Sequence, residues 1–302
     1  MSDFPTKILL ATDGSEDAAL ASRAAVELSV RSGSELHIVH AWQAPTQTTY
    51  VPSAKEGYPL LHELLARELL EEQVERLEAL RGKVTEAHLR RGSPAEEITG
   101  LSEDLEADLL FVGSRGLGTI TSLVLGSVSE KVTYLAPCPI LVVRGEAGAW
   151  PLQRVIIGDD ASEGAKRAAE AAVGIAKLFE AQVVLVRTGY PKPQLTLPGQ
   201  SWQSARAQRE REALARMHER RRLKKALEKR AGELEERLGR QAHVRTAVGD
   251  AAAFILEVAA EGEETPLIAV GSRGLGTVKS IMLGSVSRKV LRAASGPVLI
   301  AP

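Results

Sequence analysis

The chain has 302 residues, a net charge of −1 and one cysteine, and 44% of its residues are hydrophobic. This length predicts about two domains that each bury a core, and the composition excludes a disordered chain. The near-zero charge argues against nucleic acid or an anionic membrane as a partner, and no apolar run approaches the roughly 20 residues that span a bilayer. Cys138 has no cysteine to pair with and is expected to be a buried apolar residue. Together with an N-terminus that lacks a signal-peptide pattern, it predicts a cytoplasmic protein.

Apolar runs that predict strands alternate with stretches of helical periodicity. In chain order, the first half predicts strands at 7–12, 35–41, 84–90, 108–112 and 140–143, and helices between them at 16–31, 60–81, 94–106 and 127–136. Unbroken apolar runs such as DLLFVG are typical of strands buried on both faces, as in a parallel sheet. The alternation therefore predicts an α/β fold in which helices cover an open parallel sheet.

The second half repeats the first. The loop GSRGLGTITSLVLGSVS, from Gly113, and the loop GSRGLGTVKSIMLGSVS, from Gly271, share 13 of 17 positions, although Thr121 is replaced by Lys279. Further segments match in the same order, including KILLATDGS with RVIIGDDAS and CPILVV with GPVLIA. These ordered matches show that the chain contains an internal duplication. We predict two tandem doubly wound domains, 1–145 and 152–302, joined by a Gly- and Pro-containing link.

The repeated loops are candidate ligand sites, because open parallel sheets bind ligands beyond the carboxyl ends of their strands. Glycines 113, 116, 118 and 126 allow positive φ and close approach of a ligand to the backbone. Gly126 to Ser129 open a helix whose free N–H groups, with two serine hydroxyls, form an anion site. The same residues also fit an ordinary glycine turn with a serine cap. Two copies, each with an aspartate after its first strand, favour a phosphate cradle.

The pattern G-2x-G-9x-G-[ST] is filled by Gly113, Gly116, Gly126 and Ser127, and again by Gly271, Gly274, Gly284 and Ser285. Together with KILLATDGS and CPILVV, it makes the chain resemble a tandem universal stress protein of the ATP-binding type. The resemblance implies two Rossmann-like domains that hold ATP, with Mg²⁺ as a further candidate ligand and the metal ligands left open.

The resemblance also implies a set of binding residues in each half. In the first half these are Ala11, Thr12, Asp13, Ala41, Val112, Gly113, Arg115, Gly116, Gly126, Ser127, Val128 and Ser129. In the second half they are Gly158, Asp159, Asp160, Thr188, Val270, Gly271, Arg273, Gly274, Gly284, Ser285, Val286 and Ser287. No catalytic residue is implied in either half.

The second copy departs from the first beside its presumed site. Thr12 is replaced by Asp159, a carboxylate that either binds Mg²⁺ or repels phosphate. We expect repulsion, and hence tighter binding in the first half. Gly14 is replaced by Ala161, a change that matters little if φ is negative at this position.

A basic stretch, 206–240, carries 13 Lys/Arg and 7 Asp/Glu and predicts a long helix. Leucines 223, 227, 234 and 238 share one face, which should dock on the sheet. The charges fit either a surface for an acidic partner or a solvated helix face, and we favour the solvated face. Without aromatic residues between the charges, nucleic acid is not an expected partner.

The last strands of the two halves, 140–143 and 298–301, would each leave an apolar edge exposed. We therefore expect them to meet and to make one chain a pseudo-dimer, which still permits a homo-oligomer. The favoured function is a cytosolic ATP-binding stress-response or regulatory protein with little or no turnover, because no general base is evident. The alternatives are a slow ATPase or related adenine-nucleotide enzyme, and a nucleotide-independent scaffold that binds partners through 206–240.

Overall fold

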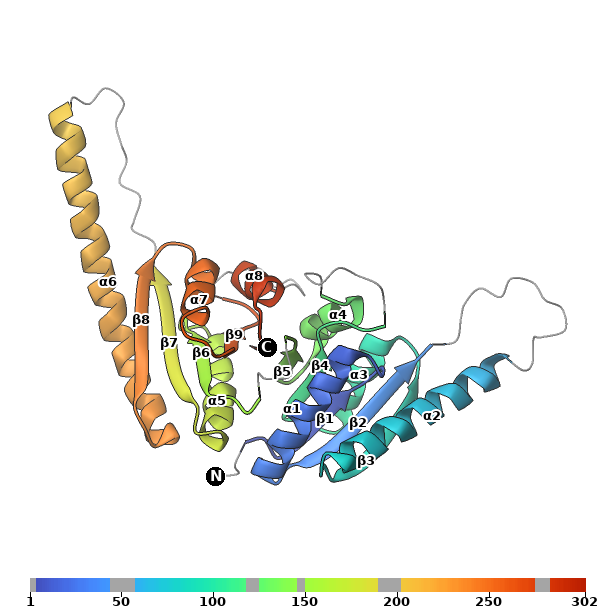
Figure 1. Ribbon diagram of the computed structural model, residues 1–302. Coiled ribbons are helices and arrows are strands. Elements are labelled where there is room, and N and C mark those ends of the chain that lie inside the picture. Colours follow the sequence, from blue (N-terminus) through green and yellow to red (C-terminus); the bar gives the residue numbers. More distant parts are fainter. Residues whose placement is uncertain (1–3, 44–57, 118–124, 146–149, 190–201, 275–282) are drawn as a thin grey trace.

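The structure, a computed structural model, describes residues 4–43, 58–117, 125–145, 150–189, 202–274 and 283–302 (Figure 1). The first half contains β1 (Lys7–Ala11), α1 (Glu16–Ser32), β2 (Glu35–Trp42), α2 (Tyr58–Ala79), β3 (Val84–Arg91), α3 (Pro94–Asp104), β4 (Leu109–Gly113), α4 (Ser127–Leu135) and β5 (Ile140–Val143). The second half contains β6 (Arg154–Gly158), α5 (Glu163–Leu178), β7 (Gln182–Gly189), α6 (Trp202–Leu238), β8 (Ala242–Val248), α7 (Ala251–Ala259), β9 (Leu267–Gly271), α8 (Ser285–Ala293) and β10 (Val298–Ala301). The predicted elements of the first half are all present.

The strands of both halves form one sheet with the order β3-β2-β1-β4-β5-β10-β9-β6-β7-β8. Within each half neighbouring strands are parallel, and β1 lies beside β4. The halves meet where β5 and β10 pair antiparallel, with Leu141 opposite Leu299. This pairing confirms the expected contact between the two last strands, and with it the intramolecular pseudo-dimer. Each short strand covers the edge that the other would expose.

Helices cover both faces of the sheet (Figure 1). Buried side chains of α1, α2, α5 and α6 form one hydrophobic core, and those of α3, α4, α7 and α8 form another on the opposite face. Strand β4 contributes Phe111 to the first core and its neighbours Leu110 and Val112 to the second. Successive strand side chains point to opposite faces, so a strand with helices on both faces is apolar at every position.

Helix α6 is the longest element, with 37 residues and a length of about 55 Å. Leu223, Leu227, Leu234 and Leu238 are buried against the sheet, which confirms the predicted docking face. Figure 1 shows the N-terminal part of α6 projecting beyond the strands it covers. Among the helices of the described residues, none has the length and apolar character needed to cross a membrane.

Candidate functional site

Each half contains one cavity at the carboxyl ends of its central strands, β1 and β4 in the first half and β6 and β9 in the second. Their volumes are about 310 Å³ and 360 Å³, within the range of small-molecule pockets. All twelve residues predicted for the first half line the first cavity, and all twelve predicted for the second half line the second. The topology therefore brings together residues that lie 118 positions apart in the first half, Ala11 and Ser129, and 129 positions apart in the second, Gly158 and Ser287. Gly118, Thr121 and Lys279 lie outside the described residues.

Apolar side chains that the sequence did not single out complete both cavities. In the first they are Ala18, Pro94, Ile98 and Leu117, and in the second Ala165, Val186, Ala251 and Ile255. Helices α3 and α7 contribute Ile98 and Ile255 at equivalent places. Such walls suit a flat apolar ring. The matching segments RRGSPAEEI, from Arg90, and AVGDAAAFI, from Ala247, span the starts of these two helices. Their similarity is the sequence pattern from which both isoleucines could have been found.

The helix that opens on each cavity lacks a side-chain cap. Ser15 and Ser162 accept hydrogen bonds from the first turns of α1 and α5. Helices α4 and α8 instead begin after Gly126 and Gly284, which have no side chain to offer. Unpaired N–H groups and the helix dipole make such a terminus a site for an anion.

One of the two expected hydroxyls in each half is already engaged. Ser129 donates to the carbonyl oxygen of Gly113 at 2.7 Å, and Ser287 donates to that of Gly271 at 2.6 Å. These bonds tie the start of each helix to the end of the neighbouring strand. A donor for a ligand is therefore available from the hydroxyl of Ser127, which is exposed, and not from Ser129.

The described glycines of the first motif are required because neighbouring backbone and side chains pack closely against them. Positive φ, which the sequence also allowed, is not the reason. Gly113, Gly116 and Gly126 are absent from the residues with positive φ, and Gly126 has φ −64°. A Cβ at Gly113 would lie 2.7 Å from the backbone N of Ala18, so α1 could not pack against β4. A Cβ at Gly116 would overlap a carboxylate oxygen of Asp13.

Asp13 links the two loops of the first site, and Asp160 holds the equivalent place in the second. The Oδ1 atom of Asp13 accepts from the N–H of Ser15 at 3.0 Å, and its Oδ2 accepts from the N–H of Leu117 at 3.2 Å. Asp160 accepts from the N–H of Ser162 at 2.9 Å. Each carboxylate oxygen has a further lone pair for a ligand hydroxyl.

The loop after the first strand needs a left-handed residue in both halves. Gly14 has φ +79°, and Ala161, at the equivalent position, has φ +66°. The replacement was expected to matter little if φ were negative here, and that condition is not met. A residue with a Cβ in this conformation costs roughly 1 kcal/mol relative to glycine.

Arg115 is engaged by an aspartate that the sequence did not single out. Its Nε and Nη2 donate to Asp17 at 3.0 Å and 2.9 Å, and Ser114 also donates to this carboxylate. Burial alone would raise the pKa of Asp17, but the hydrogen bonds from Arg115 and Ser114 outweigh it and hold this pKa below its ordinary value. The Arg115 side chain therefore faces an internal partner as well as the cavity.

Arg273 occupies the equivalent place in the second half, but the residue equivalent to Asp17 is Gly164. Within the described part of the chain, no carboxylate forms an ion pair with Arg273, whose carbonyl accepts from Ser162. The two repeated loops thus have the same sequence at this arginine and a different charge around it. A guanidinium without a partner can turn toward an anion in the cavity.

Asp159 does not present a free charge to the second cavity. Its Oδ2 lies 3.0 Å from Nη2 of Arg187, and both side chains are largely buried. The Nε of Arg187 also donates to the backbone oxygen of Asp159 at 2.9 Å. In the first half the equivalent contact is made by His40 to the oxygen of Thr12. The expected repulsion between Asp159 and phosphate is wrong in its premise, because Arg187 neutralises the carboxylate.

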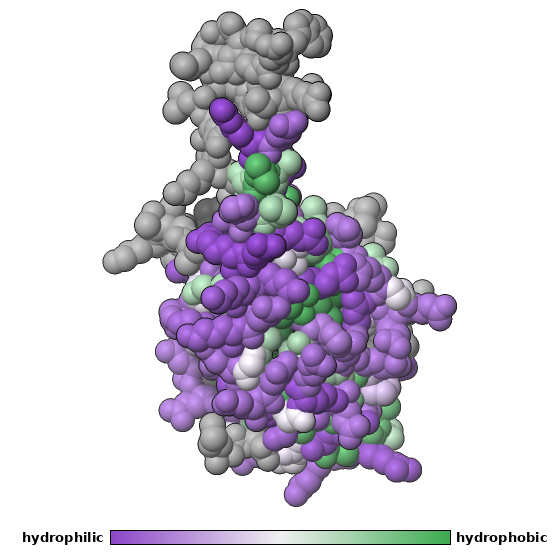
Figure 2. All heavy atoms as spheres, turned by 90° about the vertical axis from the view of Figure 1, so that its left-hand side faces the viewer, coloured by the Kyte–Doolittle hydropathy of each residue, from purple (hydrophilic) through white to green (hydrophobic). Residues whose placement is uncertain are grey.

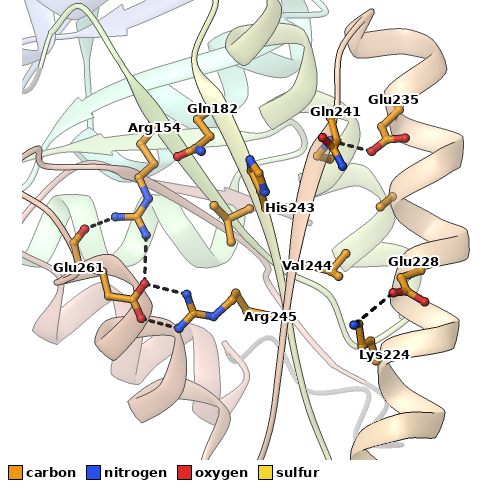
Figure 3. A pocket seen from close by; sticks show the side chains of 13 residues that line it. Arg154, Gln182, Lys224, Glu228, Glu235, Gln241, His243, Val244, Arg245 and Glu261 are labelled. Carbon is orange, nitrogen blue, oxygen red and sulfur yellow. Dashed lines mark hydrogen bonds and ion pairs between the residues drawn. The ribbon is translucent and has the colours of Figure 1, made fainter.

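A larger cavity of about 560 Å³ lies between α6 and β8 (Figure 3). Its charged groups pair with one another. Glu261 binds both guanidinium nitrogens of Arg245 at 2.6 Å and 2.8 Å and also approaches Arg154, while Lys224 lies 3.6 Å from Glu228. Because these charges are satisfied within the protein, this cavity is a weaker ligand site than the two repeated ones.

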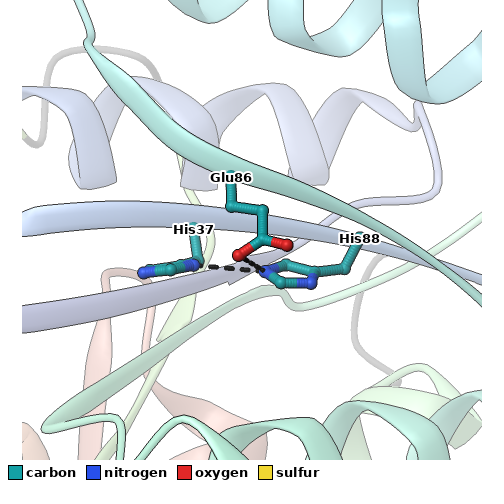
Figure 4. Close-up of side chains that lie close together, drawn as sticks. All are labelled: His37, Glu86 and His88. Carbon is teal, nitrogen blue, oxygen red and sulfur yellow. Dashed lines mark hydrogen bonds and ion pairs between the residues drawn. The ribbon is translucent and has the colours of Figure 1, made fainter.

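A cluster of His37, Glu86 and His88 lies on β2 and β3 (Figure 4). Its composition suits a metal, but its geometry is that of a hydrogen bond. Nδ1 of His37 and Nε2 of His88 are 3.1 Å apart while the ring centroids are 5.4 Å apart, so the nitrogens lie between the rings and face each other. A shared metal would require both lone pairs to converge on a third point. Burial lowers the pKa of His88, and the nearby His37 and Arg90 add to this effect against the opposing charge of Glu86.

Known proteins resemble both halves. The model of the universal stress protein family matches residues 5–144 and again residues 151–302. A universal stress protein of Thermus aquaticus, encoded in the QAH/OAS sulfhydrylase 3′ region, is 42% identical over 140 residues, which cover 45% of this chain and 97% of the relative. The universal stress protein YxiE of Bacillus subtilis is 34% identical over 155 residues, covering 46% and 98%. The crystal structure of a universal stress protein from Archaeoglobus fulgidus superposes on the whole chain with a TM-score of 0.68, 23% identity and 99% coverage of both chains.

Proposed function

This chain belongs to the universal stress protein family, and we propose that it is an ATP-binding regulatory protein of the stress response that holds one nucleotide in each half. The observation that carries the proposal is the repeated pairing of an apolar cavity with an uncapped helix terminus. Gly126 and Gly284 place the backbone N–H groups of α4 and α8 at the cavity wall. An adenine nucleotide combines the flat ring and the polyanion that these two surfaces suit.

The base would lie among the apolar side chains of each cavity, near the ends of β2 and β7. Ala41 and Thr188 line the cavities at these strand ends and offer backbone groups to its edge. The ribose hydroxyls would reach Asp13 or Asp160, and the phosphates would reach the first turns of α4 and α8. Mg²⁺, where it takes part, would bind mainly to phosphate oxygens, because it binds few protein carboxylates directly.

We further propose that turnover is slow or absent. Asp13 and Asp160, the carboxylates that line the cavities beside the motif loops, already accept backbone N–H hydrogen bonds, which suits holding a ribose better than activating water. Arg115 is paired with Asp17, so its charge is partly neutralised before a phosphate binds. A slow ATPase is the alternative that an assay of phosphate release would reveal.

Two measurements test binding. First, protein purified without added nucleotide is denatured, and the released small molecules are identified by mass. Second, calorimetry with ATP, AMP and cyclic AMP compares the native chain with Gly126→Val, Gly284→Val and the double variant. Valine can adopt the φ of −64° at Gly126, while its side chain fills space 3.3 Å from the Arg115 Cα atom. Gly100→Ala is the control, because an added Cβ there meets nothing within 4 Å.

We expect two bound nucleotides in the native chain, one in each single variant and none in the double variant, all with unchanged circular dichroism. Full binding by the double variant would remove the phosphate cradle from this proposal. A protein that neither carries nor binds any of the three nucleotides would favour the alternative scaffold function.

A further inference from the structure

Helices α2 and α6 hold equivalent positions in the two halves but have opposite charges. Each follows the second strand of its half and packs beside an edge of the ten-stranded sheet, α2 at β2 and β3 and α6 at β7 and β8. Figure 1 shows the two helices at opposite ends of the molecule. Any contact between these two surfaces must therefore join two copies of the chain.

The surface of α2 that faces away from the sheet begins apolar and continues acidic. Leu61 and Leu64 are 53% and 54% exposed. Glutamates follow at 7, 10 and 11 positions after Leu61, namely Glu68, Glu71 and Glu72, and all three are exposed. These five residues, which we term the acidic face, lie opposite the side of α2 that packs on the sheet.

An exposed surface of α6 has the same order of residues with the opposite charge, and its Met217, Arg221 and Lys224 also line a hollow against β8. Leu214 and Met217 are 54% and 49% exposed. Basic residues follow at 7, 10 and 11 positions after Leu214, namely Arg221, Lys224 and Lys225, and all three are exposed. These five residues form the basic face. Figure 2 views this end of the molecule and shows a small hydrophobic area on the projecting part of α6, among hydrophilic side chains.

We propose that the acidic face of one copy docks in parallel on the basic face of a second copy. The equal spacing places two apolar residues against two apolar residues, and three glutamates against three cations, in one register. One copy keeps its basic face unused and the other keeps its acidic face, so the contact is heterologous and can repeat head to tail.

Charge selects this pairing over the alternatives. Two basic faces or two acidic faces would juxtapose like charges, which is destabilising. The segment 216–230 carries eight Lys/Arg and two Glu, and Arg221 and Lys225 have no ion-pair partner among the described residues. Lys224 and Glu72 have partners on their own helices, Glu228 and Arg76, and such exposed pairs hold by only a few tenths of a kcal/mol and can exchange. A nucleic acid would pair with the cations but would leave Leu214 and Met217 uncovered.

The test is sedimentation velocity of the full chain over a range of concentrations at low and high salt. One variant neutralises the acidic face (Glu68→Gln, Glu71→Gln, Glu72→Gln) and another the basic face (Arg221→Gln, Lys224→Gln, Lys225→Gln). Glutamine preserves helix propensity, and circular dichroism checks the fold. Arg237→Gln removes a charge from α6 outside the basic face and serves as the control.

We expect the native chain and the control to associate at low salt and to dissociate at high salt, because the cations and carboxylates are exposed. Each face variant alone should be monomeric. Mixing the two should yield a 1:1 complex and nothing larger, because the mixture offers one intact acidic face and one intact basic face per pair. A native chain that is monomeric at every concentration would overturn the proposal.

Face variants that still self-associate would also overturn the proposal, and so would a mixture of the two variants that stays monomeric. An oligonucleotide added to each protein tests the competing occupant. If it binds the native chain, fails to bind the basic-face variant, and neither protein self-associates, the basic face serves a polyanion and the proposed docking is wrong.

Discussion

Asp17→Asn should strengthen ATP binding in the first half. The carboxylate of Asp17 holds the guanidinium of Arg115 by two hydrogen bonds, and the second half has Gly164 in its place. Asparagine has nearly the same shape and still accepts from Ser114, but it carries no charge. Arg115 is then free to turn toward the phosphates, as we expect Arg273 to do in the second half.

The magnitude follows from the charge that is released. A unit charge about 5 Å from a phosphate charge contributes roughly 1–3 kcal/mol for effective dielectric constants between about 80 and 20. The side chain of Arg115 is 39% exposed, which places the gain near the lower limit, about 1 kcal/mol or roughly fivefold in Kd. The fold loses the ion pair, a cost of about 1–2 kcal/mol in the free energy of unfolding.

The pH dependence of stability has a definite sign. The pKa of Asp17 in the folded protein lies below its ordinary value of 3.8, so the pair stabilises the fold above this pH. The contribution is lost as the pH falls below 3.8 and the carboxylate takes up a proton. Asp17→Asn should therefore flatten the acid limb of the stability curve.

Calorimetry on the Gly284→Val background isolates the first site. The reciprocal variant, Gly164→Asp on the Gly126→Val background, should pair with Arg273 and weaken the second site by a similar factor. An added Cβ at Gly164 has its nearest contact at 3.3 Å, with the backbone oxygen of Arg273, so the loop must shift by a few tenths of an ångström and circular dichroism checks the fold of this variant. Unchanged or weaker binding by a folded Asp17→Asn protein would show that Arg115 does not reach the nucleotide. The same reasoning predicts that the native second half, where Arg187 neutralises Asp159, binds more tightly than the first.

Three further predictions concern the fold. Ala161→Gly should raise the free energy of unfolding by about 1 kcal/mol, because φ is +66° there, whereas Gly14→Ala should lower it by a similar amount; chemical denaturation measures both, and equal stabilities would contradict the left-handed turn. The Cys138 thiol, whose pKa burial raises to about 12, should react with a thiol reagent at pH 8 only after unfolding; rapid labelling of the folded chain would show that the site is open. The pKa of His88 in the folded protein lies below its ordinary 6.5, so the unfolded chain takes up the proton first as the pH drops. The free energy of unfolding should therefore fall below pH 6.5, and His88→Gln should reduce the slope of that fall. An unaltered slope would assign the acid sensitivity to other groups.

The element order could be predicted from the sequence because it depends on local patterns. Unbroken apolar runs predict doubly covered strands, and the repeated loops mark their own positions in both halves. The antiparallel contact of β5 with β10 was also predictable, since an apolar four-residue edge needs a cover. The family motif then assigned the lining residues, and both cavities contain them.

The charge of each site could not be predicted this way, because it depends on partners that are distant in the chain. Asp17 lies 98 residues before Arg115, and Arg187 lies 28 residues after Asp159, on a neighbouring strand. Two loops with the same local sequence therefore receive different electrostatic surroundings.

The sequence by itself determined the duplication and the α/β fold, because periodicity and spacing are properties of neighbouring positions, and its resemblance to a known family supplied the motif residues of each cavity. Only the tertiary structure decided that the Ser129 hydroxyl donates to a backbone carbonyl, that Arg115 pairs with Asp17 and that Arg187 neutralises Asp159. The physical reason is that a hydrogen bond or an ion pair depends on the distance and direction between two groups in space. Those become defined only when the sheet has brought its strands and loops together.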